Sequence, residues 1–157
     1  MRRLPSLLLF VIGSTIAHLG YSAPYTVTTL AGYAAYGSDD GTGGNSRFYH
    51  PQGMAVDRAG NIYVADTDNS TIRKITPAGV VTTIAGSAGI AGYADGVGST
   101  ARFWKPQGMA VDAAGNVYVS DTPNQTIKKI SPDGTVITLA GNVLFAPDWA
   151  DGMGSAA

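Results

Sequence analysis

The stretch P-Q-G-M-A-V-D-R-A-G-N-I-Y-V-A-D-T-D-N-S-T-I-R-K-I-T-P-A-G-V-V-T-T-I-A-G, residues 51–86, decides the fold because the chain contains it twice. The second copy, residues 106–141, reads P-Q-G-M-A-V-D-A-A-G-N-V-Y-V-S-D-T-P-N-Q-T-I-K-K-I-S-P-D-G-T-V-I-T-L-A-G and starts 55 residues after the first. A tandem repeat of about this length is typical of an architecture made of stacked copies of one structural unit.

Each copy contains four short runs that read as strands. They are rich in β-branched and aromatic residues, and Gly, Pro, Asp or Asn separates one run from the next. No window of ten residues or more shows helical periodicity. We therefore predict an all-β fold in which each copy is a four-stranded antiparallel sheet. The expected strands are 54–57, 62–65, 71–75 and 80–85 in the first copy and 109–112, 117–120, 126–130 and 135–140 in the second.

The turns between the runs support this interpretation. Gly60 can take a positive φ at no steric cost, and Asp57 can accept backbone hydrogen bonds across its turn. We assign turn or structural roles to one set of residues in each copy: Asp57, Gly60, Asn61, Asp66 and Asn69 in the first, and Asp112, Gly115, Asn116, Asp121 and Asn124 in the second.

The apolar pattern also predicts which side chains are buried. The first run, 54–57, is short and apolar, as expected for a strand covered on both faces. In the third run we expect Ile72 and Ile75 to be buried, whereas Arg73 and Lys74 can reach water through their long stems.

A second repeated element precedes each copy. Residues 37–51 read G-S-D-D-G-T-G-G-N-S-R-F-Y-H-P, and residues 92–106 read G-Y-A-D-G-V-G-S-T-A-R-F-W-K-P. The glycines allow a compact surface loop. We expect Phe48 and Phe103, at the ends of the two loops, to wedge between adjacent copies, where burial of such a side chain contributes around 2 kcal/mol or more.

A four-stranded antiparallel sheet repeated in tandem is typical of a β-propeller, in which each sheet is one blade. A β-solenoid is the alternative, but its coils are usually shorter and need no four-stranded meander. We therefore predict a β-propeller. We also expect Asp40 and its counterpart Asp95 to bond the backbone of their own loops rather than a ligand.

The motif P-x-G-M-A-V-D-x-x-G-N-x-Y-V-x-D-x-x-N-x-x-I, at 51–72 and 106–127, resembles the NHL repeat. The preceding D-G-x-G-x-x-x-R-F, at 40–48 and 95–103, is similar to the variant found in exported bacterial NHL proteins and in the NHL propeller of teneurins. The resemblance covers nearly everything from Tyr25 onward and implies a propeller, usually six-bladed. It does not imply one function, because one fold hosts many functions.

The two ends of the chain carry partial copies. Residues 25–32 match the fourth run of the repeat, and residues 151–157 match 95–101. One leading strand and two sets of four make nine strands, one more than two complete blades need. We therefore expect two complete blades plus a leading outer strand in an incomplete ring, the front of a longer propeller, because repeats need neighbours and caps. A trimer of two-blade chains is the alternative, and it leaves one spare strand per chain.

The N-terminus is typical of a secretory signal peptide, since Arg2 and Arg3 precede an apolar run at 7–16 that is followed by small residues. This run is too short to span a bilayer as a helix. An uncleaved membrane anchor is the alternative. We predict cleavage near Ser22 and Ala23, a secreted, periplasmic or cell-surface location, and no membrane span in the mature chain. The predicted units are a signal peptide at 1–22 and a partial NHL propeller at 23–157, with repeats at about 37–86 and 92–141 and the start of a third at 142–157.

Composition narrows the chemistry. The chain has no cysteine, so disulfides and thiolate metal sites are excluded. All 11 acidic residues are Asp, and without Arg2 and Arg3 the remaining 8 basic residues give a net charge of −3. Nucleic-acid binding is therefore not expected, because it needs a positive surface.

Little in the sequence supports catalysis. His50 is the one histidine after the predicted signal peptide and its counterpart is Lys105, so three-histidine metal ligation is excluded. Residues 66–70 resemble the start of a calcium loop, but no Glu follows at the bidentate position and turn capping is the better interpretation. We predict no catalytic residue, no metal and no cofactor. The alternative is a fragment of a propeller lyase or hydrolase, gluconolactonase-like, whose catalytic residues lie in other blades.

A binding role has more support, because propellers present inter-blade loops on a rigid scaffold. The two copies differ at Tyr49/Trp104, His50/Lys105, Arg58/Ala113 and Asp68/Pro123. Aromatic and charged residues at a loop edge suit contact with a protein or a glycan, although neutral variation at solvent-facing sites is the alternative. We predict an exported, non-enzymatic interaction scaffold that binds through Tyr49, His50, Trp104 and Lys105. Self-association through open blade edges is also possible on this pattern.

Overall fold

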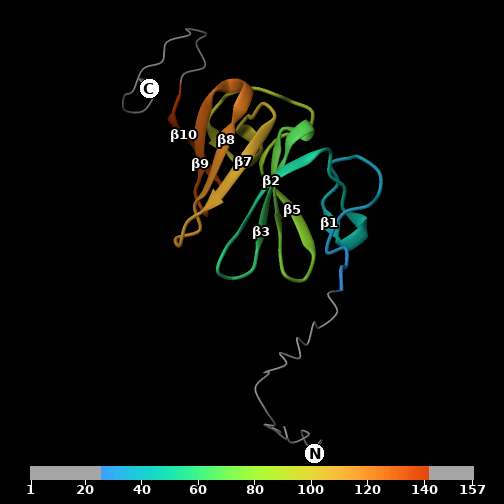
Figure 1. Ribbon diagram of the computed structural model, residues 1–157. Coiled ribbons are helices and arrows are strands. Elements are labelled where there is room, and N and C mark those ends of the chain that lie inside the picture. Colours follow the sequence, from blue (N-terminus) through green and yellow to red (C-terminus); the bar gives the residue numbers. More distant parts are fainter. Residues whose placement is uncertain (1–25, 142–157) are drawn as a thin grey trace, which may run out of the picture.

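The computed structural model describes residues 26–141, which form two five-stranded antiparallel sheets lying side by side (Figure 1). We call the first sheet blade 1 and the second blade 2. Blade 1 has the strand order β1-β5-β4-β3-β2, and blade 2 has the order β6-β10-β9-β8-β7. The strands of blade 1 are β1 Gly41–Thr42, β2 Pro51–Val56, β3 Ile62–Asp66, β4 Thr71–Ile75 and β5 Val80–Gly86. Those of blade 2 are β6 Gly96–Val97, β7 Pro106–Val111, β8 Val117–Asp121, β9 Thr126–Ile130 and β10 Thr135–Ala140.

The helical elements in this part of the chain are four short 3-10 turns, two per blade. They are η1 Gly43–Asn45, η2 Thr67–Asn69, η3 Gly98–Thr100 and η4 Thr122–Asn124. The all-β fold predicted from the sequence is confirmed. The first strand of each copy begins three residues earlier than predicted, because Pro51 and Pro106 already pair with the neighbouring strand.

The two sheets have the same internal register. Met54 lies opposite Val64 in blade 1, and Met109 lies opposite Val119 in blade 2. Each sheet also gains a short outer strand that the sequence did not predict. β1 pairs with the start of β5, and β6 pairs with the start of β10. The two copies therefore fold alike, down to the loop that leads into each of them.

Phe103 lies at the centre of the core between the blades and is fully buried. A Cβ atom placed on Gly86 of blade 1 would lie 3.3 Å from its ring. The predicted wedge between adjacent copies is therefore confirmed for Phe103. The other buried members of this core are Tyr63, Ala65, Ile72, Ala85, Ala101, Val117, Val119, Ile130 and Val136.

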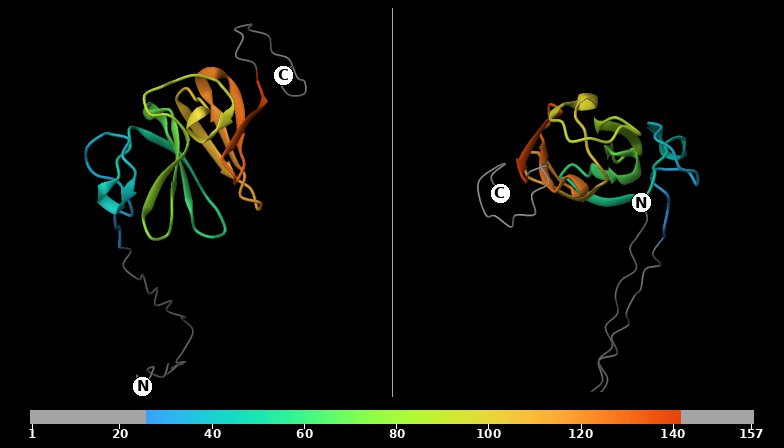
Figure 2. Two further views of the ribbon diagram at one scale, coloured as in Figure 1. Left: turned by 180° about the vertical axis from the view of Figure 1, so that it is seen from behind. Right: turned by 90° about the horizontal axis from the view of Figure 1, so that it is seen from above.

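Phe48 holds the equivalent place on blade 1, where its neighbour is the N-terminal segment instead of another blade. It packs with Val64, Ile75 and Val81, and Ala31 packs against the same cluster. The blue-to-teal part of the chain lies on the side of blade 1 that faces away from blade 2 in both orientations (Figures 1 and 2). The two aromatic residues thus differ in what covers them.

Three predictions about strands and burial are wrong. Residues 26–32 form no strand, and the backbone bond of Gly32 goes to the Gly43 carbonyl in η1. Met54 and Val56 of β2 are 67% and 58% exposed, since blade 2 contacts this strand from one side. Arg73 does not reach water and is fully buried. Ile72 and Ile75 are buried as predicted.

The predicted turn chemistry is confirmed. Gly60 has a φ of 81° and donates its N–H to the Asp57 carbonyl, while Asp57 Oδ1 accepts the N–H groups of Ala59 and Asn61. In the second copy Gly115 has a φ of 83°. Glycine is favoured here because other residues rarely adopt a left-handed backbone.

Two predicted segments, the signal peptide at 1–22 and the start of a third repeat at 142–157, lie outside the described residues. Within residues 26–141 no helix has the length and apolar character needed to cross a membrane.

Candidate functional site

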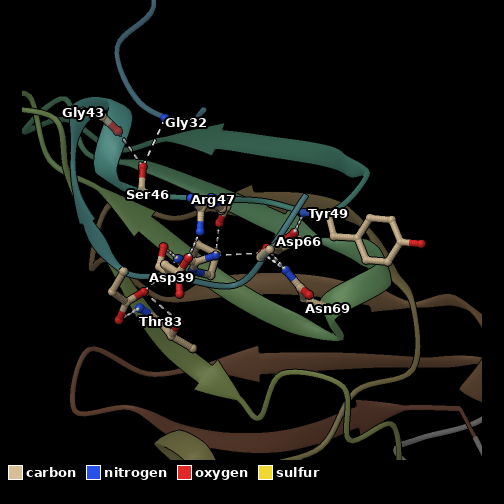
Figure 3. A network of polar contacts seen from close by, with 12 residues as sticks. Gly32, Asp39, Gly43, Ser46, Arg47, Tyr49, Asp66, Asn69 and Thr83 are labelled. Atoms are coloured by element: carbon tan, nitrogen blue, oxygen red, sulfur yellow. Dashed lines mark hydrogen bonds and ion pairs between the residues drawn. The ribbon is translucent and has the colours of Figure 1, made fainter. Parts of the chain in front are cut away.

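Arg73, on β4, holds the loop that leads into blade 1. Its Nη1 donates to the Arg47 carbonyl at 2.9 Å and to Asp66 Oδ2 at 2.8 Å. Its Nη2 donates to the Asp39 carbonyl at 2.9 Å and to Asp40 Oδ1 at 2.8 Å. Figure 3 shows Asp39, Arg47 and Asp66 gathered around this network. A buried charge is stable only when it is paired and hydrogen-bonded; these four bonds satisfy both terminal nitrogens of Arg73, and Nε is buried without a partner.

Asp66 and Asn69 anchor the loop as well as the turn in which they lie. Asp66 is fully buried, and its Oδ1 accepts the backbone N–H of Tyr49 at 2.7 Å. Asn69 Nδ2 donates to Asp66 Oδ2 at 2.8 Å and to the Gly37 carbonyl at 2.6 Å. Neither side chain caps η2. The bond between Asn69 and Asp66 spans the turn as predicted, and the other polar groups of the two side chains hold the preceding loop instead of capping η2.

Asp40 also has a role different from the predicted one. Its carboxylate accepts hydrogen bonds from the backbone N–H of Thr83 at 3.0 Å and from the Thr83 hydroxyl at 2.9 Å, in addition to the bond from Arg73. Burial acts to raise the pKa of Asp40, but the bonds from Thr83 and Arg73 outweigh it and hold the pKa below the ordinary 3.8. Asp40 thus ties the loop to β4 and β5 and does not bond its own loop backbone.

Blade 2 repeats this arrangement with Lys128 in place of the arginine. Lys128 is fully buried, and its Nζ donates to the Tyr93 carbonyl at 2.8 Å, to Asp95 Oδ1 at 2.6 Å and to the Thr138 hydroxyl at 2.9 Å. Asp95 accepts the N–H and hydroxyl of Thr138, as Asp40 does from Thr83. The prediction that Asp95 bonds its own loop is wrong for the same reason.

The lysine does not reach the buried carboxylate of Asp121. Asp121 accepts the Trp104 N–H at 2.7 Å and Asn124 Nδ2 at 2.7 Å, but it has no hydrogen bond from Lys128. Burial raises the pKa of Asp121 above the ordinary 3.8, and these bonds offset the effect only in part. Asn124 also donates to the Gly92 carbonyl at 2.7 Å. Blade 2 therefore has the weaker version of the network.

At the opposite end of each blade another aspartate accepts hydrogen bonds from an asparagine and a tyrosine. Asp112 Oδ2 accepts Asn116 Nδ2 at 2.7 Å and the Tyr118 hydroxyl at 3.0 Å. The hydrogen bond from Asn116 is the main cause that lowers the pKa of Asp112 to about 2. Asp57 is held in the same way by Asn61 and Tyr63 in blade 1. These aspartates are occupied in closing their turns.

The predicted binding residues Tyr49 and His50 lie side by side at the entry to β2. The Tyr49 ring centroid is 5.2 Å from that of Tyr36 and 4.8 Å from that of His50. In Figure 3 the Tyr49 ring points away from the buried network. His50 contacts the Asp68 carboxylate through Nδ1, and its φ of 46° is uncommon for a residue other than glycine.

Asp68 brings residues from both blades together. Lys105, at the entry to blade 2, places Nζ 3.5 Å from Asp68 Oδ1. The hydrogen bond from His50 is the largest cause that lowers the pKa of Asp68, and Lys105 adds to it. Trp104 precedes Lys105 and is 42% exposed. We call Tyr49, His50, Asp68, Trp104 and Lys105 the loop-edge cluster.

Sequence reasoning missed two contributors to this surface. Asp68 lies 18 residues after His50, and its meeting with Lys105 depends on how the blades pack. The signal available was that Asp68 is one of the positions at which the two copies differ. Tyr36 lies before the repeated loop, and no repeat pattern pointed to it.

The described residues offer no group of three His or Asp side chains placed to hold a metal ion. A cavity of about 210 Å³ opens between the blades at the end of the strands away from the loop-edge cluster. Tyr63, Lys74 and Ile84 of blade 1 line it together with the turn of blade 2 that contains Pro132.

Comparison with known proteins places these features in a family. The profile of the teneurin NHL domain matches residues 30–96, and that of the NHL repeat matches residues 103–130. The protein SUPPRESSOR OF QUENCHING 1, chloroplastic, of Arabidopsis thaliana is 35% identical over 109 residues, which are 66% of this chain and 10% of that protein. NHL repeat-containing protein 2 of Bos taurus is 32% identical over 108 residues, 67% of this chain and 15% of that protein.

Solved structures agree on the fold. A structural genomics protein of unknown function from Bacteroides thetaiotaomicron VPI-5482 is 35% identical, with a TM-score of 0.52 over 62% of this chain and 24% of that one. An auxiliary nutrient binding protein from the same organism is 21% identical, with a TM-score of 0.53 over 62% of this chain and 26% of that one.

The two sheets are thus β-propeller blades. The repeats that form them are NHL repeats, as the motif P-Q-G-M-A-V-D indicated. The matched part of the chain spans 10% and 15% of the lengths of these two curated relatives.

Proposed function

We propose that this chain is an exported, non-enzymatic interaction scaffold that contacts a protein or glycan through the loop-edge cluster. The observation that carries the proposal is the meeting of His50 and Lys105, from successive blades, at the single carboxylate of Asp68. The cluster combines the exposed Trp104 and the half-buried Tyr49 with charged groups on a rigid base, which is the composition of binding hot spots. Its position on inter-blade loops agrees with the usual place of function on a scaffold.

The buried networks support the scaffold part of the proposal. Asp66 and Asn69 fix the backbone at Tyr49 and Gly37, so the loop that carries Tyr49 and His50 is held in one conformation. A preorganised loop binds with a smaller entropic cost than a flexible one.

The occupied carboxylates support the non-enzymatic part. Asp57 and Asp66 and their counterparts in blade 2 accept hydrogen bonds from the turns or loops that they hold, and Asp40 and Asp95 accept theirs from neighbouring strands. A general base or metal ligand needs a carboxylate that is free to meet a substrate or ion. The alternative, a fragment of a propeller lyase or hydrolase, draws no support from these residues.

Export is tested by the mature N-terminus. Protein recovered from the medium or periplasm of an expressing bacterium should begin near Ser22 or Ala23. Recovery of chains that start at Met1 in the cytoplasm would contradict export.

Binding is tested on an array of neutral and acidic oligosaccharides with the purified chain. A variant with alanine at Tyr49, His50, Trp104 and Lys105 should lose binding by about tenfold or more, as expected for loss of hot-spot side chains. A matched control carries Arg58→Ala and Lys129→Ala, outside the loop-edge cluster. Equal binding by both variants, or no glycan bound by the unaltered chain, would contradict glycan recognition here.

A further inference from the structure

The cavity of about 210 Å³ between the blades has one wall from each of them, and every residue that lines it lies in the two complete repeats. It opens at the end of the strands away from the loop-edge cluster. The side chains that matter for its chemistry are Tyr63, Lys74 and Ile84 of blade 1, and Val117, Ile130 and the turn with Pro132 of blade 2.

The wall from blade 1 carries a cation on an otherwise apolar face. Residues two apart on a strand share a face of the sheet, so Lys74 lies on the same face of β4 as Ile72. Ile72 is fully buried in the core between the blades. Lys74 pairs across the strands with Tyr63, and its Nζ lies 5.8 Å from the centroid of that ring. The core between the blades therefore ends in an ammonium group at the cavity.

Lys74 differs from the neighbouring cations in having no partner in the part of the chain that the structure describes. Arg73, the preceding residue, makes two ion pairs, and Lys128 makes one, whereas no ion pair or hydrogen bond within residues 26–141 includes the Lys74 ammonium. The aspartates of the adjoining turns are already engaged. Asp57 accepts the bonds of Asn61 and Tyr63, and Asp133 accepts the N–H of Thr135 at 3.0 Å. The half-buried ammonium is thus available to an anion that enters the cavity.

The wall from blade 2 is apolar and rigid. Val117 and Ile130 lie opposite each other on β8 and β9, and each is 2% exposed. The turn beside them is closed by the Gly134 N–H, which donates to the Ser131 carbonyl at 2.8 Å. A Cβ atom on Gly115 would lie 3.7 Å from the Pro132 ring, so the two turns of this wall brace each other. A preformed wall lowers the entropic cost of binding a ligand.

We propose that this cavity binds a small monocarboxylate whose body is a single ring or a short branched chain. The Lys74 ammonium pairs with the carboxylate, and Ile84, Val117 and Ile130 cover the apolar body. One ammonium suits a group with one negative charge, whereas phosphate is usually held by several donors. The volume lies below the range of about 300–1,000 Å³ that holds drug-sized molecules, which limits the size of the ligand. The site is separate from the loop-edge cluster and does not rest on the function proposed for it.

Titration of the isotope-labelled chain with phenylacetate, followed by amide chemical shifts, tests the proposal. The amides of Gly115, Ser131 and Gly134 should shift and saturate, with a millimolar dissociation constant or tighter. Phenylacetamide keeps the ring and removes the charge, and it should bind about tenfold or more weakly. Inorganic phosphate keeps a charge and lacks the ring, and it should leave these amides unshifted.

Two variants test the two walls of the site. Lys74→Met keeps the length of the side chain and removes the ammonium, so it should weaken phenylacetate binding by about tenfold or more. Ile84→Phe adds volume at the cavity and should also weaken binding. The matched control is Lys129→Met, which removes the equivalent ammonium of blade 2, outside the cavity, and should leave the affinity unchanged.

Circular dichroism checks that each variant is folded, and Lys74→Gln replaces Lys74→Met if the latter unfolds. Four results would overturn the proposal: no saturable shift at the three amides, equal affinity for phenylacetamide, phosphate binding at the same amides, or full affinity in the folded Lys74 variant.

Discussion

Replacing Arg73 by methionine removes the charge at the centre of blade 1 while keeping a side chain of similar length. The change deletes the four hydrogen bonds from the guanidinium and leaves Asp66, which is fully buried, without its cation. Removing one partner of a buried ion pair costs about 3–5 kcal/mol, because the remaining charge is buried and unpaired.

Lys128 in the second copy shows which of these hydrogen bonds a lysine can keep at this position. Lys128 keeps a carbonyl bond and the bond to Asp95 but does not reach Asp121. Arg73→Lys should therefore lose the bond to Asp66 and one of the two carbonyl bonds, and it should gain a bond to the Thr83 hydroxyl like that of Lys128 to Thr138, a net loss of one bond. A hydrogen bond to a charged group contributes about 1.5–3 kcal/mol, so this variant should be destabilised by roughly that amount.

Urea unfolding followed by circular dichroism measures both variants against the unaltered chain. The expected order of stability is unaltered chain, Arg73→Lys, then Arg73→Met. If Arg73→Met is as stable as the unaltered chain, or if the lysine variant loses as much as the methionine variant, the network does not hold the loop as described.

Three further predictions concern the core, blade 2 and pH. Phe103→Ala should lower the free energy of unfolding by about 3–5 kcal/mol because the ring is fully buried. Phe48→Ala should lower it by about 1–2 kcal/mol because its ring is only partly covered. Equal losses of the two variants in urea unfolding would contradict this difference. Lys128→Arg should stabilise the chain by roughly 1.5 kcal/mol through a new bond to Asp121; a lower midpoint in urea would refute it. The pKa of Asp112 is about 2 in the folded chain, below the ordinary value of 3.8. Its contribution to the free energy of unfolding should therefore be fully present above pH 3.8 and should decrease as the pH falls from there toward 2. Urea midpoints measured at each pH should show a smaller decrease for Asp112→Asn.

The sequence predicted the blades because their signals are local and doubled. Gly60 and Gly115 mark the same turn in both copies, and both have positive φ in the structure. Ile72 and Ile75 follow strand alternation, and both are buried. The wedge at Phe103 was predictable because its loop is repeated as a unit.

What the sequence could not predict depends on contacts between distant residues. Arg73 was expected in water because a long cation on a strand usually reaches it, and its burial depends on carbonyls that lie 26 and 34 residues away. Asp68 joins the loop-edge cluster through Lys105, across the blade junction. Such partners follow from the packing of the loop on its own blade and of one blade on the next, and they leave no trace in a single run of sequence.

The two equivalent blades contact each other in tandem, and nuclear Overhauser effects measured on the full chain report this contact. Tandem packing predicts cross-peaks between the Phe103 ring protons and Gly86, and a matching set between the Phe48 ring protons and Gly32. Phe103 cross-peaks only to residues of its own blade would contradict the packing of the two copies.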